Sequence, residues 1–192
     1  MKNTMYDYGG GEYYNDGGVI PLPVIGASGR QPAEKDKLLS EERGSGARFN
    51  AGKPDYSLVP LKLMAESLIQ ERPDSVAAKA LFLLGFYQTS RDVHMLYAAA
   101  RELGHPGWAE CAQVFSYGRD KYAPWNWAKG MPWSAPLSSA VRHLVAMLAG
   151  ESDDAESGLP HRGHVFCNLV MLLTYSAKYV EGDDFAPAGA LV

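Results

Sequence analysis

The chain has 192 residues, 46% of them hydrophobic and 21% charged, a composition that suits a globular protein with a core. Its net charge of −4 argues against binding to duplex nucleic acid, which favours a basic excess. No apolar run is long enough for a membrane span, so we expect none. The N-terminus lacks the apolar core of a signal peptide, which favours a cytoplasmic location.

Residues 1–47 form the first predicted segment, a flexible arm rich in glycine and proline. Half of all the glycines precede residue 53, and a charged run, EKDKLLSEER, follows the prolines. Such a stretch buries too little apolar surface to offset its loss of chain entropy. The sequence therefore predicts an arm at 1–47, a domain at 48–180 and a frayed tail at 181–192.

Six helices are predicted after the arm. They are expected at 61–70, at 75–87 with Asp74 as N-cap, at 91–103 with Ser90 as N-cap, at 108–122, from 134 or 136 to 150, and at 160–180. No stretch shows the sustained alternation of a strand, and short connections favour antiparallel helices. Cys111 and Cys167 lie in helical patterns outside any C-x-x-C motif, so we expect buried free thiols. The predicted fold class is all-α.

The stretch from 142 to 168 carries most of the candidate chemistry. Histidines and carboxylates gather there: His143, Glu151, Asp153, Asp154, Glu156, His161 and His164. His161 and His164 share one helix face, which Asn168 continues. Carboxylates beside histidines can hold the divalent cations that phosphate hydrolysis requires. The alternatives are a merely solvated acidic loop and histidines that cap or line the core.

Aromatic and basic side chains alternate between residues 117 and 129, in the fourth helix and the loop after it. Arg119 and Lys121 are candidates to balance phosphate charge, and Trp125 and Asn126 are candidates to bind a base. The alternative is that these tryptophans fill the core or an interface. Further from this cluster, Lys53 could reach a phosphate from an ordered arm, although G-K-P-D is not a phosphate-loop motif.

Three strings of the sequence resemble the phage dATP/dGTP diphosphohydrolase family, also called MazZ. They are R-F-N-A-G-K-P-D-Y-S-L-V-P-L, then E-C-A-Q-V-F-S-Y-G-R-D-K-Y-A-P-W-N-W-A-K-G-M-P-W, then R-H-L-V-A-M-L-A-G-E-S-D-D-A-E-S-G-L-P-H-R-G-H-V-F-C-N-L. The resemblance covers about residues 47–178, and words such as K-Y-x-x-x-N-W and E-S-G-L-P-H make it specific. The family is related to the MazG-like nucleotide pyrophosphohydrolases and occurs in phages that replace adenine with 2-aminoadenine, among others.

The resemblance implies a MazG-like helical bundle and cleavage of a purine deoxynucleoside triphosphate, dGTP or dATP, between the α- and β-phosphates. It implies Mg²⁺ or Mn²⁺, with two or more ions, and a homo-oligomer, either dimer or tetramer. In the 2-aminoadenine pathway it implies conversion of dGTP to dGMP in the cytoplasm of the host cell. Two features depart from this pattern. The MazG motifs E-E-x-x-E and E-x-x-D are missing, and the segment 64–107 is longer than expected, which indicates a helical insertion.

The expected site residues follow from position and resemblance together. The expected catalytic residues are Glu110, Glu151 and Asp154. The expected metal ligands are Glu110, Glu151, Asp154, Glu156, His161 and His164. The expected substrate-binding residues are Lys53, Arg119, Lys121, Trp125, Asn126, Arg142, His143 and Asn168. There are two alternatives. One is an HD-like metal nucleotidase, which ranks lower because the adjacent His-Asp pair that such enzymes need does not occur in this sequence. The other is a phage nucleotide-binding or interaction module without enzymatic activity.

Overall fold

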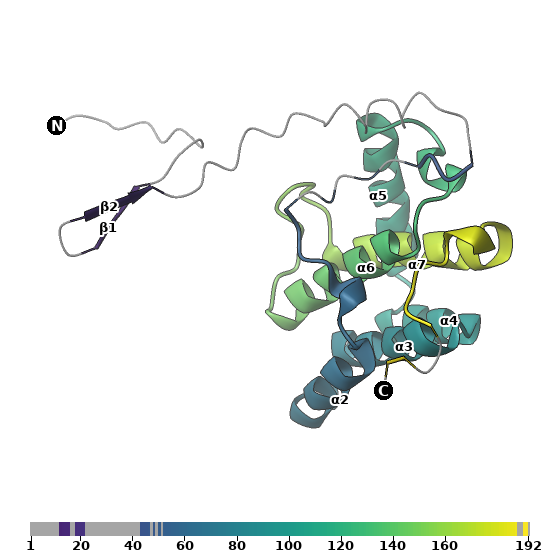
Figure 1. Cartoon of the computed structure of the whole chain (residues 1–192), viewed down its shortest axis with the longest axis horizontal. Helices are drawn as coiled ribbons and strands as arrows, with labels where there is room; N and C mark the ends of the chain where they lie inside the picture. Colours follow the sequence, from purple (N-terminus) through teal and green to yellow (C-terminus); the bar gives the residue numbers. More distant parts are fainter. Residues whose placement is uncertain are drawn as a thin grey trace.

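The computed structural model describes residues 12–15, 18–21, 43–46, 48, 50, 52–187 and 190–191, the first two segments as backbone only. Its described part is a bundle of long helices, which confirms the predicted all-α class (Figure 1). The long helices are α2 (Leu61–Glu71), α3 (Val76–Ser90), α4 (Val93–Leu103), α5 (Gly107–Lys121), α6 (Ser134–Leu148) and α7 (His161–Lys178). Short 3₁₀ turns are η1 (Tyr56–Leu58), η2 (Asn126–Lys129) and η3 (Val180–Gly182).

Two helices, α3 and α7, organise the packing. α7 packs against α4, α5 and α6, while α3 packs against α2, α4 and α6. The sequence of α3, VAAKALFLLGFYQTS, is apolar on every face, which is typical of a helix buried on several sides. α7 carries eleven buried residues along its eighteen, so it forms the centre of the half of the bundle that contains α5 and α6.

The helix starts differ slightly from the predicted ones. Ser75, not Asp74, caps α3, because its hydroxyl accepts a hydrogen bond from the backbone N–H of Ala78 at 3.3 Å. Asp92, not Ser90, caps α4. The reason is that Arg91 adopts a left-handed conformation with φ 59°, which ends α3 and lets the chain turn before α4 begins.

A short hairpin precedes the bundle in sequence. β1 (Glu12–Asn15) pairs antiparallel with β2 (Gly18–Pro21), and Asn15 lies opposite Gly18. We predicted no strand here, because strands of four residues are too short for an alternating pattern to be recognised.

The segment after α7 is anchored, where the sequence predicted fraying from residue 181. Asp184 accepts hydrogen bonds from the backbone N–H and the hydroxyl of Ser134 at 2.8 and 2.5 Å, so its carboxylate caps the start of α6. Asp183 pairs with Arg91 at 2.8 Å, and the Phe185 ring lies edge-on to Trp133. Asp184 thereby satisfies a backbone N–H that the start of α6 leaves open, and the other two contacts hold the segment against Arg91 and Trp133.

The segment 64–107, predicted to be an insertion, belongs to the same hydrophobic core as the other helices. Its buried side chains from α3 and α4 form one cluster with those of α6 and α7. Cys111 and Cys167 are free and buried, as predicted. Among the described residues, no helix has the length and apolarity that a membrane crossing requires.

Glycine permits a close approach between α2 and α3. A Cβ added to Gly85 would lie 2.6 Å from the backbone nitrogen of Lys62, whereas a Cβ at Gly118 in α5 would meet nothing within 4 Å. We expect Gly85→Ala to lower the free energy of unfolding by about 1–3 kcal/mol, since backbone must move. Gly118→Ala, the control, should raise it by up to about 1 kcal/mol. Urea unfolding followed by circular dichroism measures both, and equal stabilities would contradict the close approach.

Candidate functional site

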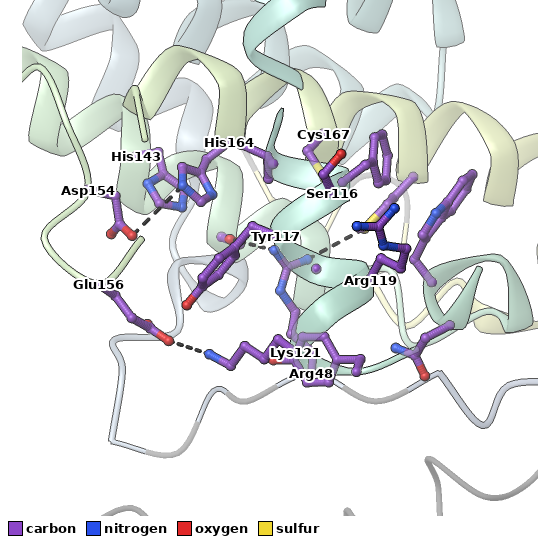
Figure 2. A pocket seen from close by; sticks show the side chains of 18 of the residues that line it. Arg48, Ser116, Tyr117, Arg119, Lys121, His143, Asp154, Glu156, His164 and Cys167 are labelled. Atoms are coloured by element: carbon purple, nitrogen blue, oxygen red, sulfur yellow. Dashed lines mark hydrogen bonds and ion pairs between the residues drawn. The ribbon is translucent and has the colours of Figure 1, made fainter. Parts of the chain in front are cut away.

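A large cavity lies among the described residues. It has a volume of about 710 Å³ and lies between α5, α6, α7, the segment 48–53 and the acidic loop before α7 (Figure 2). This volume is within the range of sites for small molecules and cofactors. Its lining has three parts: a histidine–aspartate cluster, a set of cationic side chains, and an aromatic end.

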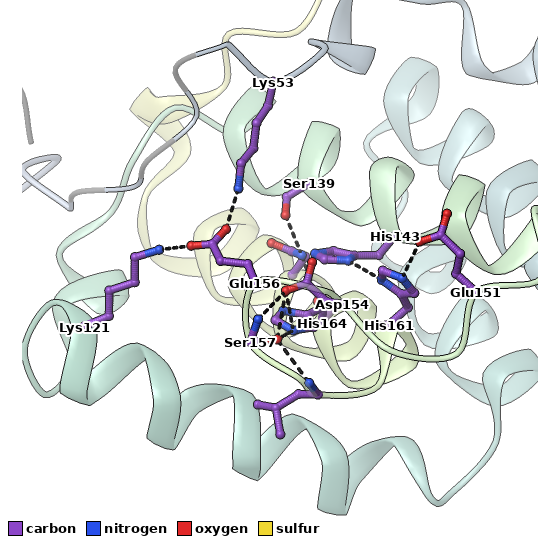
Figure 3. Close-up of polar contacts among 12 residues, drawn as sticks. Lys53, Lys121, Ser139, His143, Glu151, Asp154, Glu156, Ser157, His161 and His164 are labelled. Atoms are coloured by element: carbon purple, nitrogen blue, oxygen red, sulfur yellow. Dashed lines mark hydrogen bonds and ion pairs between the residues drawn. The ribbon is translucent and has the colours of Figure 1, made fainter. Parts of the chain in front are cut away.

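The histidine–aspartate cluster joins α6 to the start of α7. His143 Nδ1 lies 2.8 Å from His161 Nδ1, and the His143 ring stacks on His164 with centroids 4.4 Å apart (Figure 3). The spacing of His161 and His164 places both on the side of α7 that faces α6, as their separation of three residues predicted. Asp154 completes the cluster, with Oδ2 3.8 Å from His164 Nε2.

The acidic loop holds Asp154 through its own hydrogen bonds. Asp154 Oδ2 accepts from the backbone N–H and the hydroxyl of Ser157 at 3.0 and 2.9 Å. The same hydroxyl lies 2.8 Å from His164 Nε2, so Ser157 connects the aspartate to the histidine. Asp153 and Pro160 form an isolated antiparallel bridge that closes the loop. The carboxylate orientation is therefore fixed before any ligand binds.

Burial favours the neutral imidazole form at His143 and His164. Desolvation, and then the neighbouring His164 and His161, lower the pKa of His143 to about 2. Burial also lowers the pKa of His164, although the Asp154 carboxylate opposes part of that shift. A neutral imidazole is the form that ligates a metal ion.

The donor set fits a divalent cation. Among the described residues, His143, Asp154 and His161 offer ligand atoms that all lie within 4.8 Å of one another. His161 Nε2 is buried and has no hydrogen-bond partner, and the nearest carboxylate oxygen, from Glu151, is 3.6 Å away. Two imidazole nitrogens with one carboxylate suit Mn²⁺ or a similar transition-metal ion better than Mg²⁺, which prefers oxygen ligands.

Two arginines lie beside this cluster. Arg48 donates to Ser139 Oγ at 2.9 Å and contacts Met171 Sδ at 3.6 Å; within the part of the chain that the structure describes, it has no carboxylate partner. Arg142 donates to Asn50 Oδ1 and to the Pro54 carbonyl, both at 3.0 Å, and so fastens the segment 50–54 to α6. Burial, and then the charge of Arg48, lower the pKa of Arg142.

Two lysines meet at Glu156. Lys53 Nζ lies 2.9 Å from one carboxylate oxygen of Glu156, and Lys121 Nζ pairs with the other (Figure 3). The hydrogen bond from Lys121, and then that from Lys53, lower the pKa of Glu156 to about 2. All three residues line the cavity, although they come from the segment before α2, the end of α5 and the acidic loop.

The remaining wall of the cavity is aromatic. Trp127 packs on Phe115 with ring centroids 5.1 Å apart, and Trp125 lies 6.2 Å from Trp127. Trp125 has a left-handed backbone with φ 60° and is 72% exposed, while Asn126 beside it is buried. A large aromatic side chain held exposed at a rare backbone conformation is typical of a functional position.

Comparison with known proteins bears on this site. Residues 103–185 match the family model described as "dATP/dGTP diphosphohydrolase, N-terminal". This part of the chain is similar to the dATP/dGTP diphosphohydrolase family. The match confirms the predicted family and, with it, the predicted enzyme class, the nucleoside triphosphate pyrophosphohydrolases. No curated protein and no solved structure matches the chain.

The diphosphohydrolase segment includes the whole histidine–aspartate cluster, together with α5, the aromatic loop and Glu156. It leaves out the segment that carries Arg48, Asn50 and Lys53, which the structure nevertheless places in the wall of the same cavity. The site is therefore built from family sequence and from a preceding segment that adds two cationic side chains.

Most of the residues predicted for the site line this cavity. The structure brings together Lys53, Arg119, Lys121, Trp125, Asn126, Arg142, His143, Asp154, Glu156, His161 and His164. Three predicted residues are not among its lining residues. Glu110 is bound by the guanidinium of Arg162, with Oε2 2.8 Å from Nε, on another part of α5. Asn168 is buried behind the cavity, and Glu151 is exposed beside His161.

Two residues make other contacts than the predicted ones. Glu156, predicted to be a metal ligand, is engaged by two lysines, and His143, predicted to bind substrate, belongs to the potential metal cluster. Arg48 was missed as a site residue of the diphosphohydrolase. The string R-F-N-A-G-K pointed to its segment, but the G-K pair drew attention to Lys53 alone.

Proposed function

We propose that the chain hydrolyses dGTP or dATP to the monophosphate and pyrophosphate with the help of a divalent cation held by His143, Asp154 and His161. The family match supports dATP/dGTP diphosphohydrolase activity. The cation dependence and the roles of individual residues are the parts that we add here from the cavity.

The observation that carries the proposal is the position of Arg48. Its guanidinium is always charged, lies half-buried in the cavity, and has no carboxylate partner among the described residues. A partly buried cation is costly unless a negative charge compensates it. Ser139 and Met171 supply only neutral contacts. A nucleotide phosphate would supply the missing charge, directly beside the histidine–aspartate cluster.

The residues divide the work along the cavity. A divalent cation at His143, Asp154 and His161 would neutralise phosphate charge and lower the pKa of an attacking water. Ser157 holds the Asp154 carboxylate in place, and the lowered pKa of His143 keeps a ring nitrogen of that imidazole able to bind. Arg48 balances charge that develops on the phosphate oxygens at the reacting phosphorus.

The aromatic end suits the purine. Trp127 and Phe115 form an apolar wall, and Trp125 lies exposed beside them. Aromatic faces stack on bases with little preference among them. Asn126 lines the same end, and an asparagine side chain can form paired hydrogen bonds with a purine edge.

The proposal extends to the cellular setting, where the support is the resemblance of the sequence to phage enzymes. In that setting the dGMP product would feed the synthesis of 2-aminoadenine nucleotides in the cytoplasm of the infected cell. The active form would be a homo-oligomer, and the cation Mg²⁺ or Mn²⁺. The paired imidazoles favour Mn²⁺ between these two.

Turnover of the four deoxynucleoside triphosphates tests the function directly. We expect dGTP or dATP, incubated with the protein and Mn²⁺ or Mg²⁺, to yield the monophosphate and pyrophosphate, which anion-exchange chromatography separates. Release of inorganic phosphate or triphosphate would instead support an HD-like nucleotidase, an alternative that the histidine–aspartate cluster keeps open. No turnover with either ion would favour a binding module.

Cation binding is tested without turnover, by isothermal titration with Mn²⁺ and by the electron paramagnetic resonance signal of the ion. We expect His161→Ala to weaken Mn²⁺ binding by at least about tenfold, because a ligand is lost. Glu110→Gln is the control, since Glu110 pairs with Arg162 outside the cavity, and it should bind Mn²⁺ as the unchanged protein does. The reverse result would return Glu110 to the metal site.

Arg48→Met tests the phosphate role. We expect the KM for the nucleotide to rise about tenfold or more, because a charge-assisted contact with phosphate is lost. Arg43→Met is the matched control, because Arg43 is close to Arg48 in the sequence and pairs with Glu181, which does not line the cavity. Steady-state kinetics of both variants decides the matter, and an unchanged KM in Arg48→Met would remove Arg48 from the phosphate site.

A further inference from the structure

We propose that Glu156 competes with the β- and γ-phosphates of the substrate for Lys53 and Lys121, and thereby expels pyrophosphate after cleavage. The inference rests on the proposed function, since it takes the reaction to release pyrophosphate. It assigns to Glu156 a role in product release in place of the metal ligation that the sequence suggested.

Glu156 joins two cationic side chains that the fold brings from distant parts of the chain. Lys53 belongs to the segment before α2, and Lys121 is the last residue of α5. Figure 3 shows the carboxylate between the two ammonium groups, one on each oxygen. The single negative charge of Glu156 thus pairs with two positive charges, and both lysines line the cavity.

The contacts are of a kind that a stronger anion can displace. The side chains of Lys53, Lys121 and Glu156 are 38%, 28% and 43% exposed, so water screens these ion pairs. A carboxylate offers one negative charge, whereas a pair of linked phosphates offers several together with more acceptor oxygens. The polyphosphate chain of a bound nucleotide can therefore replace Glu156 at both lysines.

The position of Glu156 relative to the cluster decides which phosphates compete. Asp154 and the histidines lie two residues back along the loop and at the start of α7, where the reacting phosphorus would bind. Lys53 and Lys121 line the same cavity as this cluster, and in our proposal they hold the β- and γ-phosphates. After cleavage, pyrophosphate loses its covalent link to the base and to the α-phosphate. Glu156 then competes with free pyrophosphate for the two lysines. In the proposal dGMP makes no contact with these lysines, because it lacks the β- and γ-phosphates.

The test measures binding of inorganic pyrophosphate and of dGMP by isothermal titration, to the full chain in EDTA. We expect Glu156→Gln to bind pyrophosphate about three- to tenfold more tightly, as removal of two surface ion pairs allows, with dGMP affinity unchanged. Unchanged or weaker pyrophosphate binding overturns the proposal, because Glu156 would then only position the lysines. Tighter binding of both ligands also overturns it, because the effect would be a general change of charge.

Two further variants separate competition from indirect effects. Asp153→Asn removes a charge from the same loop. Among the described residues, the Asp153 carboxylate accepts a side-chain hydrogen bond from its neighbour Ser152, so this variant should leave pyrophosphate binding unchanged. In a Lys53→Met, Lys121→Met background, Glu156→Gln should no longer tighten pyrophosphate binding, and tightening there would refute the competition. Thermal unfolding checks that each variant is folded. These titrations need no turnover, so they test the competition at the two lysines by themselves, whereas absence of turnover would refute the proposed function.

Discussion

α7 lies between α5 and α6 and is buried along most of its length, so every polar group on it needs a partner inside the protein or a ligand. Asn168 donates to Ser139 and to the carbonyl of His164, and His164 contacts Ser157. His161 Nε2 and Asn168 Oδ1 remain without a hydrogen bond among the described residues. The burial that stabilises the bundle therefore also leaves polar atoms of α7 without partners, and a ligand could pair with them.

Close helix contact makes this burial possible. Gly163 sits where an added Cβ would lie 2.7 Å from the Cβ of Glu110, so α5 can approach the first turns of α7. The approach places the later turns of α5, with Lys121 and the aromatic loop, across the cavity from the histidines. Gly163 thus lets the two helices approach closely, and the ion pair between Glu110 and Arg162 holds the same contact.

The helices and the chemical character of the site were predictable from the sequence, because helical periodicity and local clustering of histidines and carboxylates are short-range signals. The caps of α3 and α4 were displaced because the left-handed turn at Arg91 is not evident from residue types. Glu110 misled because its partner, Arg162, is 52 residues away and pairs only after α5 and α7 pack. Arg48 was missed for the same reason: its contacts with Ser139 and Met171 depend on tertiary structure.

The fastening of residues 50–54 to α6 by Arg142 has a thermodynamic consequence. Arg48 and Lys53 reach the cavity only while this segment is seated, through the bonds from Arg142 to Asn50 and Pro54 and from Tyr56 to Ser138. Seating of the segment and anion binding are therefore linked equilibria. An anion that binds Arg48 stabilises the seated segment, and seating strengthens the affinity for the anion by the same factor. A remote substitution that loosens residues 50–56 would thus weaken nucleotide binding without altering any group that touches the nucleotide.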